Sequence, residues 1–286
     1  METNPAVDAA LARRLVDTQF PRWAGLPLIR YAPAGSDHVI FRLGAELSVR
    51  LPRHAGAIEQ AEKEAEWLPR LAPHLPLAIP VPVAIGDPDF GYPWPWAVSR
   101  WLDGEVATVE ALSGSHDAAV ELAGFLTALH RFDGETADVA GRPLATRDTA
   151  TRASIEQAGA AFGVAALTGL WDSALAAPAW AGPPVWCHGD FHTGNLLTAG
   201  GRLSAVIDFG GLGIGDPACD LMIAFTLLSA KTRATFRTAL GVDEATWTRG
   251  RGWALATGLN AYVTYAAADP RVAAQTTRQI TEALAG

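Results

Sequence analysis

Short runs in which apolar and polar residues alternate fill most of the N-terminal third of the chain. Alternation with a period of two is typical of strands that bury one face. Turn-forming residues separate the first runs at 33–37 and 44–46. Apolar residues at 7–20 and 57–71 follow a helical spacing instead. The expected strands span 26–31, 38–43, 47–51, 81–85 and 96–102.

The pattern changes after Asp103-Gly104, which predicts a boundary between two lobes. Prolines punctuate 76–95 just before it and favour an edge strand, because proline cannot donate to a sheet ladder. Beyond the boundary the apolar residues recur at helical spacing. Strands with one packed helix, followed by helices, predict an α+β protein with a small β-rich lobe and a larger helical lobe. The expected lobes span 1–102 and 103–286, the expected helices of the second lobe span 118–130, 155–177 and the chain from 216 on, and 134–154 is expected to be irregular.

Composition narrows the class of protein. The 286 residues are 49% hydrophobic and 18% charged, which gives enough apolar material for a core and too little charge for a disordered chain. The formal net charge of -8 argues against nucleic-acid binding, which needs a basic face, and favours a cationic partner. The N-terminal residues 1–17 lack the uninterrupted apolar core of a signal peptide, and no stretch of the chain has the length of a membrane span. We therefore expect a cytoplasmic protein without membrane contact.

The segment 185–197 and the Asp-Phe-Gly triplet that begins at Asp208 carry the candidate chemistry. Phosphoryl transfer depends on Mg²⁺ and positioned donors, because negative charge spreads over the moving group. Mg²⁺ takes hard oxygen ligands, and an acceptor hydroxyl needs a carboxylate that orients it and takes its proton. Asp190 can serve as that carboxylate, while Asn195 and Asp208 can offer oxygens to a metal ion. A hairpin at 196–207 would bring Asn195 and Asp208 to the same end.

The order His188-x-Asp190-x-x-x-x-Asn195, followed by the Asp208 triplet, resembles the catalytic-loop and metal-binding signatures of protein kinases. Its form His-Gly-Asp-Phe-His-x-x-Asn is similar to the aminoglycoside phosphotransferase family, which shares the protein-kinase-like fold. The resemblance implies a bilobal enzyme that uses Mg²⁺ and ATP or GTP as co-substrate. It also implies that the acceptor is the hydroxyl of a small molecule.

The segment Asp216-Pro-x-x-Asp220-Leu resembles a downstream motif of the same family. In that family the second Asp opens a helix and braces the catalytic loop, so the resemblance assigns this role to Asp220. A carboxylate at a helix N-terminus can accept backbone N–H bonds and fix a loop. Plain helix capping by Asp220 is the alternative. His188 is expected to orient the loop rather than to carry a proton.

The resemblance assigns the nucleotide to the N-terminal lobe. A hairpin turn over the phosphates would include Ser36 and Asp37, although the glycine-rich pattern of protein kinases is absent. The inter-lobe hinge would follow the strand at 96–102. There the adenine edge would meet backbone groups of Arg100 and Leu102.

A cation for the phosphates is expected on the third strand, where Arg50 stands in the position that most kinases give to lysine. Arginine keeps its charge and can bind phosphate with two donors, but it is longer and planar, so the exchange is not neutral. The resemblance implies an ion-pair partner on the following helix. Glu64 fits best, and Glu62 is the alternative.

The acceptor remains open among three hypotheses. An aminoglycoside antibiotic is favoured, a metabolic or macrolide-type acceptor (choline, homoserine, sugar or macrolide) would use the same machinery, and a catalytically silent nucleotide-binding module is the third. Intact Asp190, Asn195 and Asp208 argue against the silent module, and Arg50 in place of lysine keeps it open. A cationic acceptor predicts an acidic pocket with aromatic side chains. The available candidates are Asp148, Glu156, Asp243, Glu244, Asp269, Trp253, Tyr262 and Tyr265.

Two other motif readings are weaker. His188-x-Asp190-x-His192 has the residue types of a zinc site, but only Cys187 adds a further ligand nearby. Gly213-x-Gly215-x-x-Ala218 mimics a dinucleotide fingerprint without the surrounding βαβ unit. Cys187 and Cys219 are too few for a disulfide framework, and we expect buried thiols.

Overall fold

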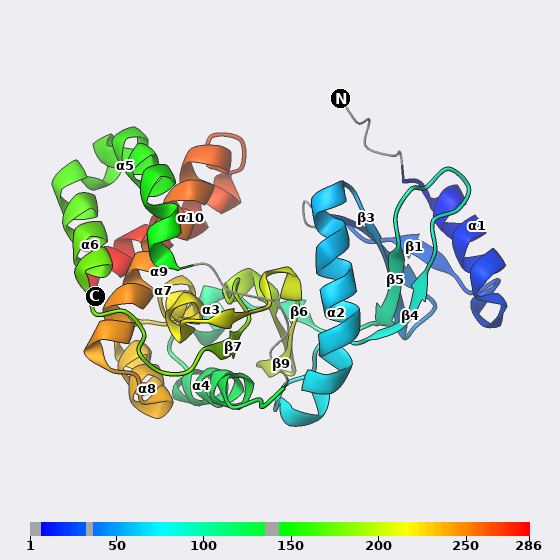
Figure 1. The fold of residues 1–286 in the computed structure, drawn as a ribbon, viewed down its shortest axis with the longest axis horizontal. Coiled ribbons are helices and arrows are strands. Elements are labelled where there is room, and N and C mark those ends of the chain that lie inside the picture. The colour runs from blue at the N-terminus through cyan, green and yellow to red at the C-terminus, as the bar shows by residue number, and fades with distance from the viewer. Residues whose placement is uncertain (1–6, 33–36, 135–142) are drawn as a thin grey trace. The chain divides into compact units, whose positions relative to one another are not determined.

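The computed structural model describes residues 7–32, 37–134 and 143–286. The chain divides into two compact units, which we call the strand unit (Met1–Gly104 with Ala205–Gly210) and the helical unit (Glu105–Ser204 with Gly211–Gly286). The five-stranded sheet belongs to the first unit and most helices to the second (Figure 1). The expected α+β class is confirmed.

An antiparallel sheet of five strands forms the strand unit, in the order β1-β2-β3-β5-β4. All five expected strands are present, with slightly different ends. β4 is an edge strand that begins at Pro82 and carries a register shift between Pro82 and Ala84, as expected for a proline in a sheet. The strands are β1 (Leu28–Arg30), β2 (His38–Leu43), β3 (Leu47–Pro52), β4 (Pro82–Gly86) and β5 (Trp96–Arg100).

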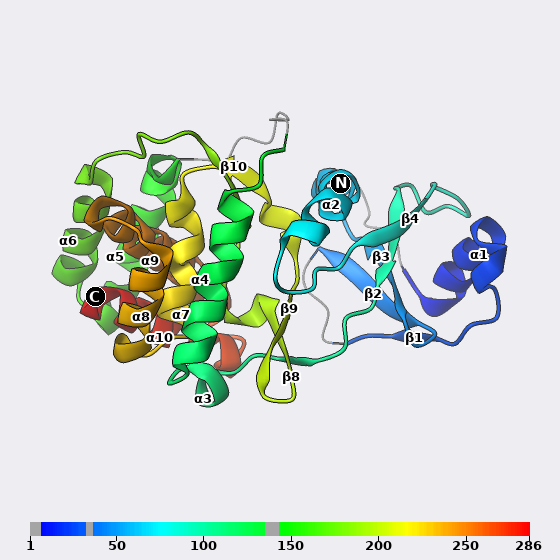
Figure 2. The ribbon, with the colours of Figure 1, turned by 90° about the horizontal axis from the view of Figure 1, so that it is seen from below.

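Two helices lie on opposite sides of this sheet (Figures 1 and 2). α1 (Ala9–Gln19) places Leu15 and Val16 in a core with Phe41 and Val98 of the sheet. α2 (Ile58–Leu71) packs on β4 and β5 and buries one side, including Glu64. The sheet therefore has both faces covered. Single 3₁₀ turns adjoin the helices at η1 (Pro21–Trp23), η2 (Ala55–Ala57) and η3 (Ala72–His74).

A late segment of the chain completes the strand unit. Ala205 forms a parallel bridge with Ala78, and the N–H of Val206 donates to the carbonyl of Ala78 at 2.9 Å. Residues up to Gly210 belong to this unit, and Asp208 is one of them.

Short strands frame the loops of the helical unit. β7 pairs antiparallel with β10, and β8 lies between β6 and β9. β8 and β9 form the hairpin that the sequence predicts. The strands are β6 (Glu105–Val106), β7 (Val185–Cys187), β8 (Leu196–Ala199), β9 (Arg202–Val206) and β10 (Gly213–Gly215).

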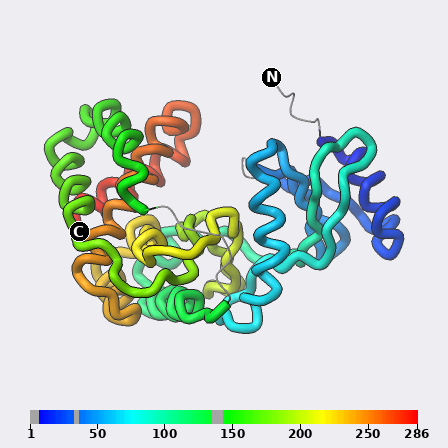
Figure 3. Tube along the Cα trace, viewed as in Figure 1, coloured from blue at the N-terminus to red at the C-terminus, as the bar shows by residue number. Residues whose placement is uncertain are grey.

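Helix α9 (Glu244–Tyr265) forms the centre of the helical unit and packs against α5, α6 and α10. The path of the chain through these helices can be followed in Figure 3. No helix in the described part of the chain has the length and apolarity that a membrane crossing requires. The other helices are α3 (Val109–Leu112), α4 (His116–His130), α5 (Asp148–Phe162), α6 (Val164–Ala176), α7 (Ile223–Thr226), α8 (Ala230–Leu240) and α10 (Pro270–Ala285), with 3₁₀ turns η4 (Leu144–Arg147), η5 (Thr193–Asn195), η6 (Phe209–Gly211) and η7 (Pro217–Met222).

Two sequence predictions about the helical unit are wrong. The stretch expected to be irregular up to residue 154 already contains η4 and the start of α5. The helix expected over 155–177 is two helices, because Gly163 has φ of 85° and stops α5. Only glycine adopts this backbone conformation at little cost, so the chain turns there.

Both cysteines are free thiols, and Cys219 is half-buried rather than buried.

Candidate active site

The catalytic loop, residues 188–195, connects β7 to β8, and the carboxylate of Asp220 holds its backbone. The backbone N–H groups of His188 and Gly189 donate to the two oxygens of Asp220, each at 2.8 Å. Asp220 is fully buried. It lies inside η7, whose N-cap is Asp216, so the alternative of plain helix capping by Asp220 is wrong. The contact expected of a bracing residue is present.

A close backbone approach fixes the turn of the catalytic loop. Gly189 has φ of 81°, and a Cβ atom placed there would lie 2.1 Å from the carbonyl oxygen of Gly211. No side chain fits in that space, and the oxygen belongs to backbone that cannot swing aside. The glycine of the His-Gly-Asp motif is therefore required by sterics as well as by its dihedral angle.

Asp190 has two polar neighbours inside the loop. Its Oδ2 lies 3.5 Å from Nε2 of His192 and 3.2 Å from Nδ2 of Asn195. The Nδ1 of His192 accepts the N–H of Gly194 at 3.0 Å, so the proton of the neutral ring sits on Nε2 and faces Asp190. His192 thus supports Asp190, a role that the sequence analysis missed by treating it only as a zinc ligand.

These neighbours set the charge of Asp190. Burial raises the pKa of a carboxyl group, but the hydrogen bond and charge of His192, with help from His188 and Asn195, outweigh it. The pKa of Asp190 therefore lies below its ordinary value. The carboxylate is ionised at neutral pH, as a group that orients and deprotonates a hydroxyl must be.

Asn195 is buried and ties the end of the loop back to its middle. Its Nδ2 donates to the backbone carbonyl of Asp190 at 2.9 Å and also to the carboxylate. The amide nitrogen is used within the loop, which leaves the side-chain oxygen as the atom that can face a metal ion. The chemistry of this donor fits Mg²⁺.

Two further contacts anchor the loop and its brace, and the sequence analysis missed both. Phe191 stacks on Phe125 of α4, with ring centroids 5.5 Å apart and an interplanar angle of 6°. Arg249 of α9 donates two hydrogen bonds to Asp216, at 2.6 and 3.0 Å. In each contact the two residues lie far apart in the sequence, so no local sequence pattern predicts the contact.

In the strand unit, Arg50 of β3 and Glu64 of α2 form the expected ion pair, with Nη1 and Oε2 2.5 Å apart. Both side chains are largely buried. Burial raises the pKa of Glu64, Arg50 opposes that rise, and the nearby carboxylate of Asp208 adds to it. Glu62, the alternative partner, is exposed. The pair holds the guanidinium of Arg50 in one place.

Asp208 follows β9 in a strained backbone conformation. Its φ is 64°, a left-handed value that costs a non-glycine residue about 1–2 kcal/mol. Such strain is typical of functional positions. Lys63, on the helix turn next to Glu64, donates to the carbonyl of Gly210 at 2.8 Å and so holds the segment that follows Asp208. Burial lowers the pKa of Lys63. Sequence patterns gave no hint of this lysine.

The structure describes three of the four other residues that were expected near the nucleotide. Ser36 lies outside the described residues. Asp37 accepts a hydrogen bond from Gln60 at 3.2 Å and pairs with His54 at 3.3 Å, so its side chain bonds to α2 and to the turn before it. The N–H of Arg100 donates to Val81 at 3.0 Å, so it is engaged within the sheet and not available to an adenine. Leu102 follows the end of β5.

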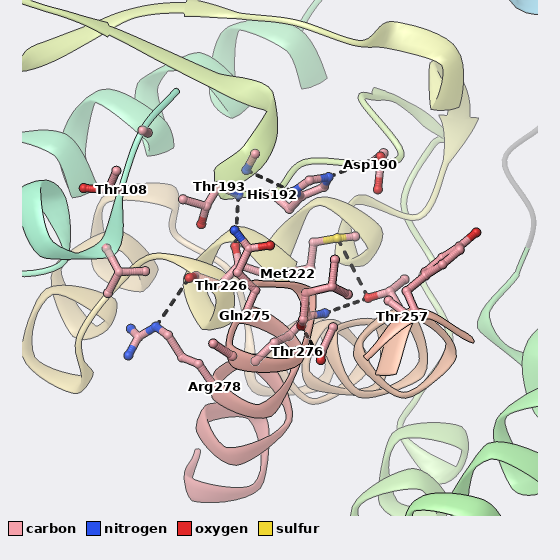
Figure 4. A pocket seen from close by; sticks show the side chains of 18 of the residues that line it. Thr108, Asp190, His192, Thr193, Met222, Thr226, Thr257, Gln275, Thr276 and Arg278 are labelled. Atoms are coloured by element: carbon pink, nitrogen blue, oxygen red, sulfur yellow. Dashed lines mark hydrogen bonds and ion pairs between the residues drawn. The ribbon is translucent and has the colours of Figure 1, made fainter. Parts of the chain in front are cut away.

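A cavity of about 740 Å³ opens beside Asp190 within the helical unit. Its walls come from the catalytic loop, α3, α7, α9 and α10. Figure 4 shows Asp190 and His192 on one side of it and the side chains of α9 and α10 on the opposite side. The ionised carboxylate of Asp190 thus meets a space large enough for a drug-sized ligand.

A model of the phosphotransferase enzyme family matches residues 29–253, which include the strand unit from β1 on, the catalytic loop and the Asp-Phe-Gly segment. The chain belongs to this family. It is a small-molecule phosphotransferase that acts on hydroxyl groups. The search of curated protein sequences found no significant match.

Solved structures similar to this phosphotransferase have the same fold. The GDP complex of wild-type aminoglycoside 2'-phosphotransferase-IIIa is 22% identical, with a TM-score of 0.75 over 98% of this chain and 99% of that one. The GDP and kanamycin complex of APH(2")-IIIa is 20% identical, with a TM-score of 0.74 over 96% and 98%. Macrolide 2'-phosphotransferase MphH from Brachybacterium faecium is 26% identical, with a TM-score of 0.63 over 97% of each chain. The bilobal protein-kinase-like fold is confirmed.

The acidic residues expected around the acceptor of this phosphotransferase lie elsewhere. None of the five carboxylates lines the cavity, and among the aromatic candidates only Tyr265 does. Most of the others have structural partners. Asp148 accepts from Trp171 and pairs with Arg152, Asp243 caps α9, Glu244 pairs with Arg237, Asp269 caps α10, Trp253 is buried, and Tyr262 packs on Phe162.

Proposed function

We propose that this phosphotransferase transfers the γ-phosphate of ATP or GTP to a hydroxyl of a small molecule bound in the cavity beside Asp190. The strand unit would hold the nucleotide and the helical unit the acceptor. The observation that carries the proposal is the ionised Asp190 at the cavity wall, in a loop braced by Asp220. Because ATP and GTP are cytoplasmic co-substrates, the activity suits the expected cytoplasmic location.

Asp190 would act on the acceptor. Its carboxylate accepts the hydrogen bond of the acceptor hydroxyl and points the oxygen at the γ-phosphorus. The new O–P bond forms as the bond between the γ-phosphorus and the bridging oxygen breaks. The hydroxyl proton passes to Asp190, and the nucleoside diphosphate leaves. The transfer is direct and needs no phosphoenzyme.

Asn195 and Asp208 would hold Mg²⁺. The side-chain oxygen of Asn195 and the exposed carboxylate of Asp208 are hard oxygen donors of the kind that this ion takes, together with phosphates and waters. When bound, the metal neutralises charge on the phosphate oxygens. The strained backbone at Asp208 supports a functional role for this residue.

Arg50 would bind the phosphates, held by its ion pair with Glu64. A buried guanidinium with a fixed partner is pre-organised and can present its remaining donors to phosphate oxygens. Two structural relatives are GDP complexes, which supports GTP as one co-substrate. Ser36, Asp37, Arg100 and Leu102 remain proposed neighbours of the nucleotide, with the N–H of Arg100 excluded as a donor.

An antibiotic is the acceptor class that the relatives support, since two are aminoglycoside enzymes and one is a macrolide enzyme. Antibiotic resistance would then be the biological role. A metabolic kinase is the second candidate, because the catalytic residues do not distinguish acceptors. The third, a silent nucleotide-binding module, is disfavoured by the intact set Asp190, Asn195 and Asp208.

The deciding experiment is a coupled assay of nucleoside diphosphate release with Mg-ATP and with Mg-GTP. The acceptors are aminoglycosides, macrolides, choline, homoserine and sugars, and mass spectrometry checks the acceptor for an added phosphate. Acceptor-dependent turnover is expected. Nucleotide binding without transfer to any acceptor, in the wild type and in Arg50→Lys, would support the silent module instead.

Calorimetry with and without Mg²⁺ separates the two functional regions. Asp208→Ala is expected to weaken Mg-nucleotide binding, whereas Asp190→Ala is expected to leave it intact. Equal effects of the two substitutions would contradict the assigned roles.

A further inference from the structure

Building on the proposed function, we infer that the acceptor is a neutral or singly charged molecule with an apolar face, rather than a polycation. The inference concerns the cavity beside Asp190 and rests on the chemistry of its described walls. A polycation needs several carboxylates around it, and this cavity has few.

Two carboxylates line the described walls, Asp190 and Glu110. Asp190 is already assigned to the reacting hydroxyl, which leaves Glu110 of α3, an exposed residue, for one ammonium group. An ammonium group that enters a cavity without a partner loses its hydration, at a cost of several kcal/mol. The walls can therefore compensate one amine.

Arg278 of α10 adds positive charge rather than negative. Its guanidinium donates to the carbonyls of Leu227 and Leu228 and pairs with Glu282 at 3.2 Å. It is held in place by these contacts, with its charge next to the end of α7. A cation in the described wall further disfavours an acceptor with many ammonium groups.

The wall threonines of α9 and α10 have hydroxyls that are already used. Thr257 donates to the carbonyl of Trp253 at 2.8 Å, and Thr276 to that of Val272 at 2.7 Å, each one helical turn earlier. A threonine bonded in this way satisfies its hydroxyl within its own helix. Gln279 likewise donates to Ala254 at 2.7 Å and to Thr257. These polar residues therefore have little hydrogen bonding left to offer a ligand.

Apolar groups complete the walls. Met222, Ala261 and Val272 line the cavity, and Tyr265 at the end of α9 is 53% exposed. A large aromatic side chain left in solvent beside a cavity offers a flat surface that a ligand can cover. Together these groups suit a molecule that buries an apolar face while it presents a hydroxyl to Asp190.

The test compares two acceptor classes by binding and by transfer. Erythromycin and clindamycin each combine one amine, several hydroxyls and an apolar body, whereas kanamycin and gentamicin carry several amines. Calorimetry at physiological salt is expected to give at least about tenfold tighter binding of a singly charged acceptor, the factor expected from the loss of one ion pair in partly buried surroundings. The preferred compound should also gain phosphate by mass.

The outcomes separate the two proposals. Tighter binding or faster phosphorylation of kanamycin or gentamicin would overturn the inference, and so would binding of neither class. If a singly charged compound binds but no acceptor is ever phosphorylated, the cavity inference stands and the proposed function falls.

Two matched substitutions sharpen the test. Gln275→Glu adds a carboxylate to the wall and is expected to tighten kanamycin binding about two- to fivefold, the range of an exposed ion pair. The control Gln157→Glu makes the same change on α5, outside the cavity, and should alter nothing. Glu110→Gln should weaken erythromycin binding by a similar factor. No response to either wall substitution would contradict the assignment of the cavity.

Discussion

In the catalytic loop, polar groups bond to residues distant in sequence or across the loop: Asp220 holds two amides, and Asn195 and His192 face Asp190. In the cavity walls, threonines bond to carbonyls of their own helices. The first arrangement fixes the position of a reactive carboxylate, whereas the second removes polar groups from a surface. The difference suggests that the loop determines the reaction and that the walls determine which molecule undergoes it.

The largest effect is expected from removal of the reactive carboxylate. Asp190→Ala should lower kcat by about 10²–10⁴-fold, the usual contribution of a general base, with nucleotide binding retained. Steady-state kinetics and calorimetry measure the two quantities. Glu156→Gln, an exposed carboxylate of α5 away from the cavity, is the matched control and should behave as wild type. A near-normal kcat in Asp190→Ala would remove Asp190 from the mechanism.

A smaller effect, on both stability and turnover, is expected from a change to Asp220, the buried carboxylate that holds the catalytic loop. In Asp220→Asn one oxygen becomes an NH₂ group, so one of the amides of His188 and Gly189 loses its acceptor in a buried place. We expect about 1–3 kcal/mol of lost stability in urea denaturation. We also expect a lower kcat with little change in KM, because Asp220 touches no substrate. Unchanged kcat in a folded variant would show that the brace does not position Asp190.

The pH dependence of activity tests the neighbours of Asp190. The pKa of Asp190 lies below its ordinary value, so kcat/KM should stay level on the acid side until the pH falls below that ordinary value, about 3.9. His192→Asn removes a group that lowers this pKa, so the acid limb of the profile should move to higher pH. An acid limb at the same pH in both proteins would mean that His192 does not act on Asp190.

The smallest effect is expected from the loss of a threonine hydroxyl in the wall of the cavity beside Asp190. Thr257→Val keeps the shape of the side chain and removes a hydroxyl that is bonded to Trp253. Since that hydroxyl serves the helix and not the ligand, KM for the acceptor should change less than about twofold, whereas the loss of a hydrogen bond to a ligand costs about 0.5–1.5 kcal/mol. A larger rise in KM, measured in the same assay, would show that Thr257 binds the acceptor directly.

The same difference explains what sequence reasoning can reach. Asp190, Asn195, Asp208 and Asp220 stand in compact motifs that resemble those of a known family. The same resemblance implies the pair of Arg50 with a glutamate of the following helix, for which Glu64 fitted best. The strands were predictable from alternation. These features depend on neighbours within one or two elements.

Features set by distant partners were out of reach. The link of Arg249 to Asp216 and the contact of Lys63 with Gly210 join residues far apart in the chain. The acidic pocket candidates failed for a related reason. Asp243 and Asp269 precede helices, where aspartate is favoured as a cap, and composition alone cannot tell a cap from a ligand.

The bridge between Ala78 and Ala205 has a consequence for biosynthesis. The strand unit is complete only when residues up to Gly210 are available, although its sheet ends with β5 at Arg100. During translation this closing segment therefore reaches the strand unit only after the ribosome has delivered β9 and the Asp-Phe-Gly triplet, well after all five strands of the sheet have been made. A truncated chain that ends at Gly104 would lack this closing segment. We expect it to refold less efficiently than the full chain and to be cleaved faster by proteases.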